Sequence, residues 1–241
     1  MRINEVLDKE DISYRETAYY KEYGAGKLFV GVKNYSGVLS YEGFHEYRPK
    51  TRKPVDTHII LHNLTNHLSK EMMGLYIRSG IFSSKGKEQA ELFGDILFRI
   101  IPNDGYDAYY NPTVKDFTVD TKYKKQTRGI MYNLIKYSSG SDRGSQIKHM
   151  KKFVDYLAIN SDNIDYNNFV ESVQKMYTNY CENINDKSII GDSEEIIKDV
   201  FQGYYMDAVD YIKGMEKISD FEKVKAGYEI IIFPHSGFWF I

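Results

Sequence analysis

Residues 80–102 read GIFSSKGKEQAELFGDILFRIIP, and this stretch decides how the chain folds. A short helix is predicted from Gly86 to Phe93, and Gly94 ends it. The following run, Ile96 to Ile101, is almost wholly apolar and stops at Pro102. Such a run between turn signals is typical of a strand that is buried on both faces. The sequence therefore predicts a helix and a buried strand directly after the two serines of the stretch.

Further strand patterns lie near both ends of the chain. Residues 27–33 predict an early strand, and residues 228–233 and 238–241 predict two late strands separated by Pro234. Between them, from about residue 121 to residue 219, apolar residues recur at helical spacing. Strands on both sides of a helical block predict a fold of the α+β class, in which an insert interrupts one domain.

Four helices follow from the spacing of apolar residues. The first has Asp56 or Thr57 as its cap, buries one face and ends at Gly74. That face consists of Ile60, Leu64, Leu68 and Met72. The other helices are marked by three apolar sets: Ile147, Met150, Val154 and Leu157; Phe169, Val173, Met176 and Tyr180; Ile196, Val200 and Tyr204.

These elements predict three regions. Residues 1–25 form an N-terminal helical segment, residues 26–120 and 224–241 together form a sheet core, and residues 121–223 form a helical insert.

Length and composition favour a folded protein of the cell interior. The chain has 241 residues, of which 42% are apolar and 15% aromatic, so it can bury a core. Cys181 is the only cysteine, which excludes an internal disulfide and a cage of cysteine ligands for zinc. We find neither a signal-peptide pattern nor a run of about 18 apolar residues, so we expect a cytoplasmic protein without membrane spans.

Charge is distributed unevenly, although the formal net charge is only −2. Residues 121–152 contain nine basic residues and one acid, Asp142, whereas residues 155–222 contain fifteen acids and five bases. The basic residues are Lys122, Lys124, Lys125, Arg128, Lys136, Arg143, Lys148, Lys151 and Lys152. Two interpretations are open: a basic surface for an anionic partner such as nucleic acid, or two helical faces of opposite charge that attract each other.

Two common binding motifs are incomplete. Residues 24–27 (GAGK) lack the other elements of a P-loop, because Lys21 and Leu28 occupy the positions of its first glycine and its final Ser or Thr. His58 and His62 are four residues apart, but no glutamate follows His58 as it does in the helix of zinc proteases. The sequence therefore predicts neither a P-loop nor a metal site.

Three pieces of the sequence occur in an order that resembles the ADP-ribosyltransferase superfamily. They are Phe29-Val30-Gly31 in the early strand, Phe82-Ser83-Ser84 followed by Phe93-Gly94, and Glu229 followed by Pro234 and Phe238. Residues 52–57 and 110–116 are similar to segments of a phage-encoded branch of this superfamily. The resemblance covers roughly residues 26–120 and 224–241, and it implies a split two-sheet core that binds NAD.

The resemblance implies a catalytic role for Glu229. Its carboxylate would stabilise the positive charge that develops on the ribose when the bond to nicotinamide breaks. Ser83 and Ser84 would lie on the side of the nicotinamide ribose. Each residue also has a structural interpretation: Glu229 as an outward-facing charge on an edge strand, and the serines as caps of the helix that follows them.

The resemblance also implies residues that hold the rest of the cofactor. Arg48 and Arg52 suit the pyrophosphate, because a guanidinium donates two parallel hydrogen bonds, and Phe93 completes the set. The arginines are otherwise surface charges in a basic loop, and Phe93 is otherwise a core residue.

The sequence departs from the superfamily pattern at two positions. Val30 replaces the arginine of the first strand, so that guanidinium is either lost or supplied by Arg48 or Arg52. Gly227 stands two residues before Glu229, where arginine-modifying members carry a second glutamate. Arginine is therefore not the expected acceptor.

The leading hypothesis is a phage-encoded, NAD-dependent mono-ADP-ribosyltransferase that modifies a host macromolecule, with NAD as its substrate. Its expected partner is a host protein or nucleic acid target. The alternative is a catalytically degenerate protein of the same fold that binds a nucleotide, nucleic acid or a host protein. Residues 1–10 resemble the targeting peptides of proteins that are packaged in tailed-phage heads, so a place in the virion is an alternative to the host cytoplasm.

Overall fold

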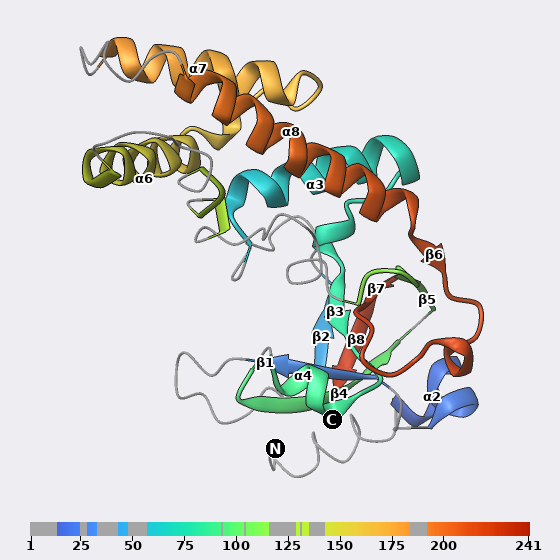
Figure 1. The fold of residues 1–241 in the computed structure, drawn as a ribbon. Helices are drawn as coiled ribbons and strands as arrows, with labels where there is room; N and C mark the ends of the chain where they lie inside the picture. The colour runs from blue at the N-terminus through green and yellow to red at the C-terminus, as the bar shows by residue number, and fades with distance from the viewer. Residues whose placement is uncertain are drawn as a thin grey trace, which may run out of the picture. The chain divides into compact units, whose positions relative to one another are not determined.

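The computed structural model describes residues 14–24, 28–32, 43–47, 57–92, 94–103, 105–115, 129–130, 132–134, 143–183 and 192–241 (Figure 1). These residues form a mixed α+β protein with two antiparallel four-stranded sheets, which agrees with the predicted fold class. The chain divides into two compact units. We call them the sheet unit and the helical unit.

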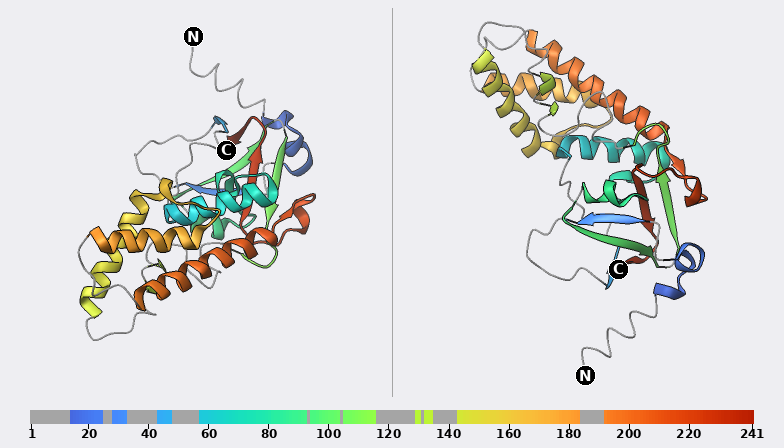
Figure 2. Two further views of the ribbon diagram at one scale, coloured as in Figure 1. Left: turned by 90° about the horizontal axis from the view of Figure 1, so that it is seen from above. Right: turned by 60° about the horizontal axis from the view of Figure 1, so that its bottom comes forward.

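The sheet unit contains the described residues of Met1–Arg52, Ser79–Lys115 and Gly214–Ile241, and the helical unit those of Lys53–Arg78 and Asp116–Lys213. Among the described residues, these limits differ from the expected ones in three places. Residues 14–24, expected in a separate N-terminal region, belong with the sheets. Residues 53–78 belong with the helices, because α3 (Ile59–Met73) packs along α8 (Asp192–Lys213), as Figure 2 shows. Residues 214–223 belong with the sheets, because they contain a strand that pairs with the second sheet.

The first sheet has the strand order β1-β4-β8-β2. Its strands are β1 (Phe29–Val32), β4 (Ile96–Pro102), β8 (Gly237–Phe240) and β2 (Gly43–Glu46). The predicted strand at 96–101 is confirmed, but the expectation that both of its faces are buried is wrong at Arg99, which is exposed. Residues directly opposite each other in paired strands share a face of the sheet. Phe98 lies opposite Val30, and both belong to the buried core. Arg99 lies opposite Phe29, so its side chain points to the other face.

The second sheet has the strand order β3-β7-β5-β6. Its strands are β3 (Ile81–Ser83), β7 (Ile230–Pro234), β5 (Tyr106–Tyr110) and β6 (Glu216–Lys217). All five residues of β7 are buried, because this strand lies between β3 and β5. A bridge between Phe29 and Ser84 joins the edge strand β1 of the first sheet to the end of β3.

The helix α4 (Lys87–Glu91) packs against β1 at a glycine. A Cβ atom on Gly31 would lie 2.0 Å from the carbonyl oxygen of Ala90, so only glycine fits this approach. The helix is shorter than the predicted span of 86–93. Its backbone must leave the helix early, because Gly94 lies against the backbone of Val32.

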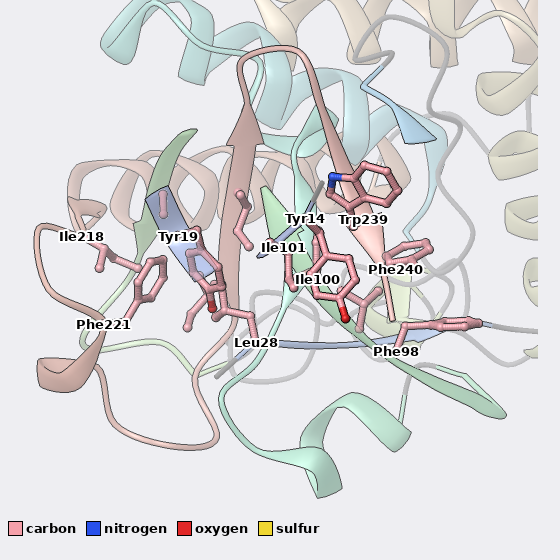
Figure 3. Close-up of a cluster of buried hydrophobic side chains, with 14 of the residues drawn as sticks. Tyr14, Tyr19, Leu28, Phe98, Ile100, Ile101, Ile218, Phe221, Trp239 and Phe240 are labelled. Atoms are coloured by element: carbon pink, nitrogen blue, oxygen red, sulfur yellow. The ribbon is translucent and has the colours of Figure 1, made fainter. Parts of the chain in front are cut away.

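One buried cluster fills the sheet unit (Figure 3). Part of it comes from the N-terminal segment, in which η1 (Tyr14–Glu16) precedes α2 (Ala18–Tyr23), and Thr17 caps α2 by accepting a hydrogen bond from the Tyr20 N–H. Tyr19 is 2% exposed and packs its ring edge-on against Tyr106 and Phe221. The N-terminal segment is therefore anchored to both β5 and η6 (Phe221–Lys223) by aromatic contacts.

The helical unit consists of α3, α6 (Arg143–Ile159), α7 (Phe169–Asn183) and α8, with η4 (Ser161–Asn163) after α6. The predicted end of α3 is confirmed, since Gly74 adopts a left-handed conformation with φ of 75°. The predicted cap is wrong: His58 caps α3, and its Nδ1 accepts a hydrogen bond from the Ile60 N–H. Asp56 lies outside the described residues.

The apolar sets that predicted the helices are mostly buried, with three exceptions: Met72 and Ile147 are exposed, and Ile196 is half-buried. Met72 is 43% exposed, because residues four apart drift by about 40° per step and Met72 lies three steps beyond Ile60. Ile147, near the start of α6, is 39% exposed for lack of a neighbour over that turn among the described residues. Met150, Val154 and Leu157 are buried as expected.

Candidate functional site

Glu229 lies directly before β7, and it is buried with 8% of its surface exposed. Its backbone N–H donates a 2.7 Å hydrogen bond to the carbonyl oxygen of Lys115. The strand that it enters lies inside the second sheet. The interpretation of Glu229 as an outward-facing charge on an edge strand is therefore wrong, and this carboxyl group is held in the interior of the sheet unit.

Ser83 lies beside Glu229 because β3 pairs with β7. The register places Ser83 opposite Ile230, the residue after Glu229. The Ser83 hydroxyl donates a 3.1 Å hydrogen bond to the Ile230 carbonyl oxygen, and the side chain is 7% exposed. Two residues that are 146 positions apart in the sequence are thus neighbours at the start of one strand pair. Because Ser83 shares a face of the sheet with Ile230, alternation along the strand turns the Glu229 side chain to the other face.

Ser84 holds the turn between β3 and α4. Its backbone exchanges hydrogen bonds of 2.8 and 2.9 Å with Phe29, and its Oγ accepts a 3.1 Å hydrogen bond from the Gly86 N–H. Gly86 is itself the N-cap of α4, and no side chain caps that helix. The interpretation of the two serines as helix caps is therefore wrong: Ser84 shapes the turn, and Ser83 binds the neighbouring strand.

A second turn positions the partner of Glu229. The buried Asn111 accepts hydrogen bonds at Oδ1 from the N–H groups of Thr113 and Val114 and from the Thr113 hydroxyl. This turn follows β5 and leads to Lys115, whose carbonyl oxygen receives the Glu229 N–H. Residues 110–116, which the sequence comparison with a phage-encoded branch singled out, therefore contain a turn that fixes the backbone at Glu229.

Two glycines bring the start of α4 against the turn that precedes Glu229. A Cβ atom on Gly86 would lie 3.7 Å from the Gly227 backbone nitrogen. Gly227 has a φ of 87°, a conformation that side chains disfavour. We call the group formed by Ser83, Ser84 and Glu229 the Glu229 site.

Two cationic side chains, Lys87 and Arg99, lie near the ring of Phe29, the residue whose backbone pairs with Ser84. The ammonium of Lys87 lies 5.6 Å from the centre of the Phe29 ring, and the guanidinium of Arg99 lies 6.0 Å from it. Both cationic side chains are exposed. Sequence reasoning missed them, although a lone charge in the apolar run 96–101 was a usable signal. They give this edge of the sheet unit a positive potential that suits an anionic group.

The other three predicted cofactor-binding residues stay a prediction. Arg48, Arg52 and Phe93 lie outside the described residues. Val30 is 9% exposed and belongs to the same buried cluster as Phe98, so position 30 contributes packing to the core.

The two histidines considered as metal ligands, His58 and His62, have contacts within α3. His58 caps α3, and burial lowers its pKa to about 4. The ring of His62 lies 3.1 Å from the Asn66 amide nitrogen. Among the residues that the structure describes, no group of three or more His, Cys, Asp or Glu side chains could hold a metal ion, and no helix is long and apolar enough to cross a membrane.

The chain matches no protein-family model, no curated protein and no solved structure.

Proposed function

We propose that this protein is an NAD-dependent mono-ADP-ribosyltransferase with an ADP-ribosyltransferase-like sheet core, and that it modifies a macromolecule. The observation that supports this function is the burial of a glutamate, Glu229, directly before β7, where this strand pairs with β3 and the serines Ser83 and Ser84 follow in the chain. The order of motifs in the sequence assigns the glutamate to catalysis and the serines to ribose binding.

The reaction needs a fixed negative charge. NAD as the substrate supplies an ADP-ribosyl group whose ribose carbon becomes electron-poor when its bond to nicotinamide breaks and the electron pair leaves with nicotinamide. The acceptor then forms a bond to this carbon and releases a proton. The Glu229 carboxylate stabilises the positive charge, and its burial strengthens this effect because little water screens it. The hydrogen bond to Lys115 fixes the backbone of Glu229 before substrate binds.

The two serines offer complementary hydrogen bonds. A hydroxyl group has one proton to donate and two lone pairs that accept. Ser83 uses its proton on the Ile230 carbonyl oxygen, so it presents lone pairs. Ser84 accepts from the Gly86 N–H and keeps its own proton for donation. Either hydroxyl offers a complement to a ribose hydroxyl, which both donates and accepts.

Arg99 and Lys87 are the described residues that suit the pyrophosphate. In the superfamily that the sequence resembles, an arginine of the first strand holds this group, but Val30 packs in the core here. Arg99 comes from the neighbouring strand, directly opposite Phe29, and Lys87 lies close to the same ring. A guanidinium can bind a phosphate through two parallel hydrogen bonds, and an ammonium adds a point charge.

The backbone at Gly227 disfavours arginine as the acceptor. A second glutamate at this position would need a φ of 87°, which strains any residue with a side chain. The acceptor in this proposal is therefore a group other than the arginine side chain.

Glu229→Gln tests the proposal. It removes the negative charge while keeping the size of the side chain, and we expect nicotinamide release from labelled NAD to fall by at least a hundredfold, the usual loss for a group that stabilises transition-state charge. The matched control is Glu216→Gln, the same change at an exposed residue of β6 in the same sheet. The assay runs with and without bacterial lysate, and it also follows label that is transferred to macromolecules. Equal nicotinamide release by the two variants, both shown to be folded, would contradict the proposal.

A second candidate function is nucleotide binding without transfer, as in a catalytically degenerate member of the fold. The core position of Val30 favours it, because an arginine expected to hold the nucleotide is absent there. Titration calorimetry with NAD separates the two candidates: heat of binding without nicotinamide release supports the binding protein, and release by the unaltered chain excludes it.

A further inference from the structure

The outer face of α6 carries a cluster of three exposed lysines. Lys148, Lys151 and Lys152 are separated by three and four residues, so their side chains lie on one face of the helix. The opposite face is buried and apolar, and it packs within the helical unit through Met150, Phe153 and Val154. The register of the buried face therefore fixes which residues point outward, and it places the three lysines together.

The lysines form no ion pair in the described part of the helical unit, although the exposed Asp155 follows them by one turn on the same face of α6. Two interpretations of the charge distribution were open: a surface for an anionic partner, or attraction between a basic and an acidic helical face. The described acids of α7 and α8 form no ion pair with the cluster, since no described carboxylate of residues 143–183 or 193–213 lies within 4.0 Å of these ammonium groups. The ion pairs at Asp107, with Lys217 and His235, lie in the sheet unit.

We infer that the face formed by Lys148, Lys151 and Lys152 binds the phosphate backbone of nucleic acid. The charge density of the face supports this class of partner. A helix rises about 1.5 Å per residue, so three positive charges occupy about 6 Å of α6. Duplex DNA carries one negative charge per about 1.7 Å of its axis, which is a similar density.

The residue type suits a repeating phosphate backbone. Lysine is an established phosphate ligand that acts as a strongly hydrated point charge, so it does not require the fixed two-bond geometry of arginine. Contacts from exposed ammonium groups to phosphates carry no sequence information, so we expect binding that is independent of sequence. It does not rest on the NAD chemistry proposed for the sheet unit.

The test is fluorescence anisotropy of a labelled 20-base-pair DNA and of the matching single strand, without NAD. The variant is K148Q/K151Q/K152Q, and the matched control is K175Q/K198Q/K213Q, which removes three exposed lysines from α7 and α8. Both variants change the net charge equally. Circular dichroism and thermal melting establish that each is folded.

We expect the contacts of the three lysines alone to weaken duplex binding about 40-fold between about 50 and 200 mM salt, because each neutralised phosphate contributes about 0.9 to the logarithmic slope. The K148Q/K151Q/K152Q variant should bind more weakly, and its slope should be shallower by about 2.7. The control should keep the slope of the unaltered protein. The inference is overturned if the unaltered protein does not bind DNA, if both variants lose equal affinity, or if labelled polyglutamate binds this face more tightly than DNA.

Discussion

The two units hold their buried polar groups in different ways. In the sheet unit, the groups of the Glu229 site bind main-chain atoms: the Ser83 hydroxyl binds a carbonyl, and Ser84 binds two backbone segments. In the helical unit, buried Thr65 and Ser69 also bind main-chain atoms. Other buried side chains there bind one another, as in the pairs His149–Tyr177, Asn133–Tyr204 and Arg78–Thr57. A site held by main-chain atoms depends on how closely backbones approach, whereas side-chain pairs depend on both partners being present.

The largest effect should come from a backbone approach in the sheet unit. Gly31→Ala places a Cβ atom 2.0 Å from the Ala90 carbonyl oxygen, and neither backbone can yield easily. We expect the free energy of unfolding to fall by about 3 kcal/mol or more, which is the upper range for overpacking. Denaturant unfolding measures it. Gly86→Ala is the control, because its nearest contact is an ordinary 3.7 Å and its loss should stay below about 1 kcal/mol. Similar losses in both variants would contradict the role of the Gly31 contact.

An effect of nearly this size should follow from acidification of the helical unit. Burial lowers the pKa of His58 from about 6.5 to about 4. A group with a depressed pKa in the folded state binds fewer protons there than in the unfolded chain. Its contribution is present above about pH 6.5, falls as the pH drops, and is lost near pH 4. The loss reaches about 3 kcal/mol by linkage.

Unfolding curves between pH 7 and pH 4 can isolate this contribution. His58→Asn keeps a cap with an oxygen acceptor but does not titrate in this range. We expect the variant to lose less stability than the unaltered protein over the interval. Parallel curves for the two proteins would show that His58 does not account for acid sensitivity.

The smallest effects compare one buried tyrosine from each unit, and they should have opposite signs. Tyr177→Phe in the helical unit removes a hydroxyl that lies 3.2 Å from His149 Nε2, so stability should fall by about 1–2 kcal/mol. Tyr19→Phe in the sheet unit removes a buried hydroxyl that has no hydrogen-bond partner among the described residues, so stability should stay equal or rise. Differential scanning calorimetry measures both. A lower Tm for Tyr19→Phe would indicate that its hydroxyl is satisfied in solution.

The sequence predicted the elements with strong local patterns. The apolar strand at 96–102, the late strands and the helices of the insert follow from periodicity and from Pro and Gly at their ends. Local patterns did not predict β2, β3, β5 or β6. The only large apolar side chain of β2 is Phe44, and β6 has only two residues. Both segments are strands because they pair with β8 and β5.

The candidate site was only partly predictable, because it also depends on which strands pair. Periodicity identifies a strand at 230–234, but it does not say that this strand pairs with residues 81–83 or lies between two others. The resemblance to a superfamily named Ser83, Ser84 and Glu229 together. Arg99 was missed because the apolar run around it predicts a strand buried on both faces. Its exposure follows only from the pairing with β1, which the sequence does not give.

The strand order has a consequence for synthesis of the protein on the ribosome. Both β7 and β8 are interior strands of their sheets, and both follow every other described element in the chain. Until they emerge, β2 and β3 have no neighbour in their sheets, although the whole helical unit has already been translated. The nascent chain therefore carries unpaired strand edges for most of its translation, a period in which a chaperone that shields such edges would protect it from aggregation.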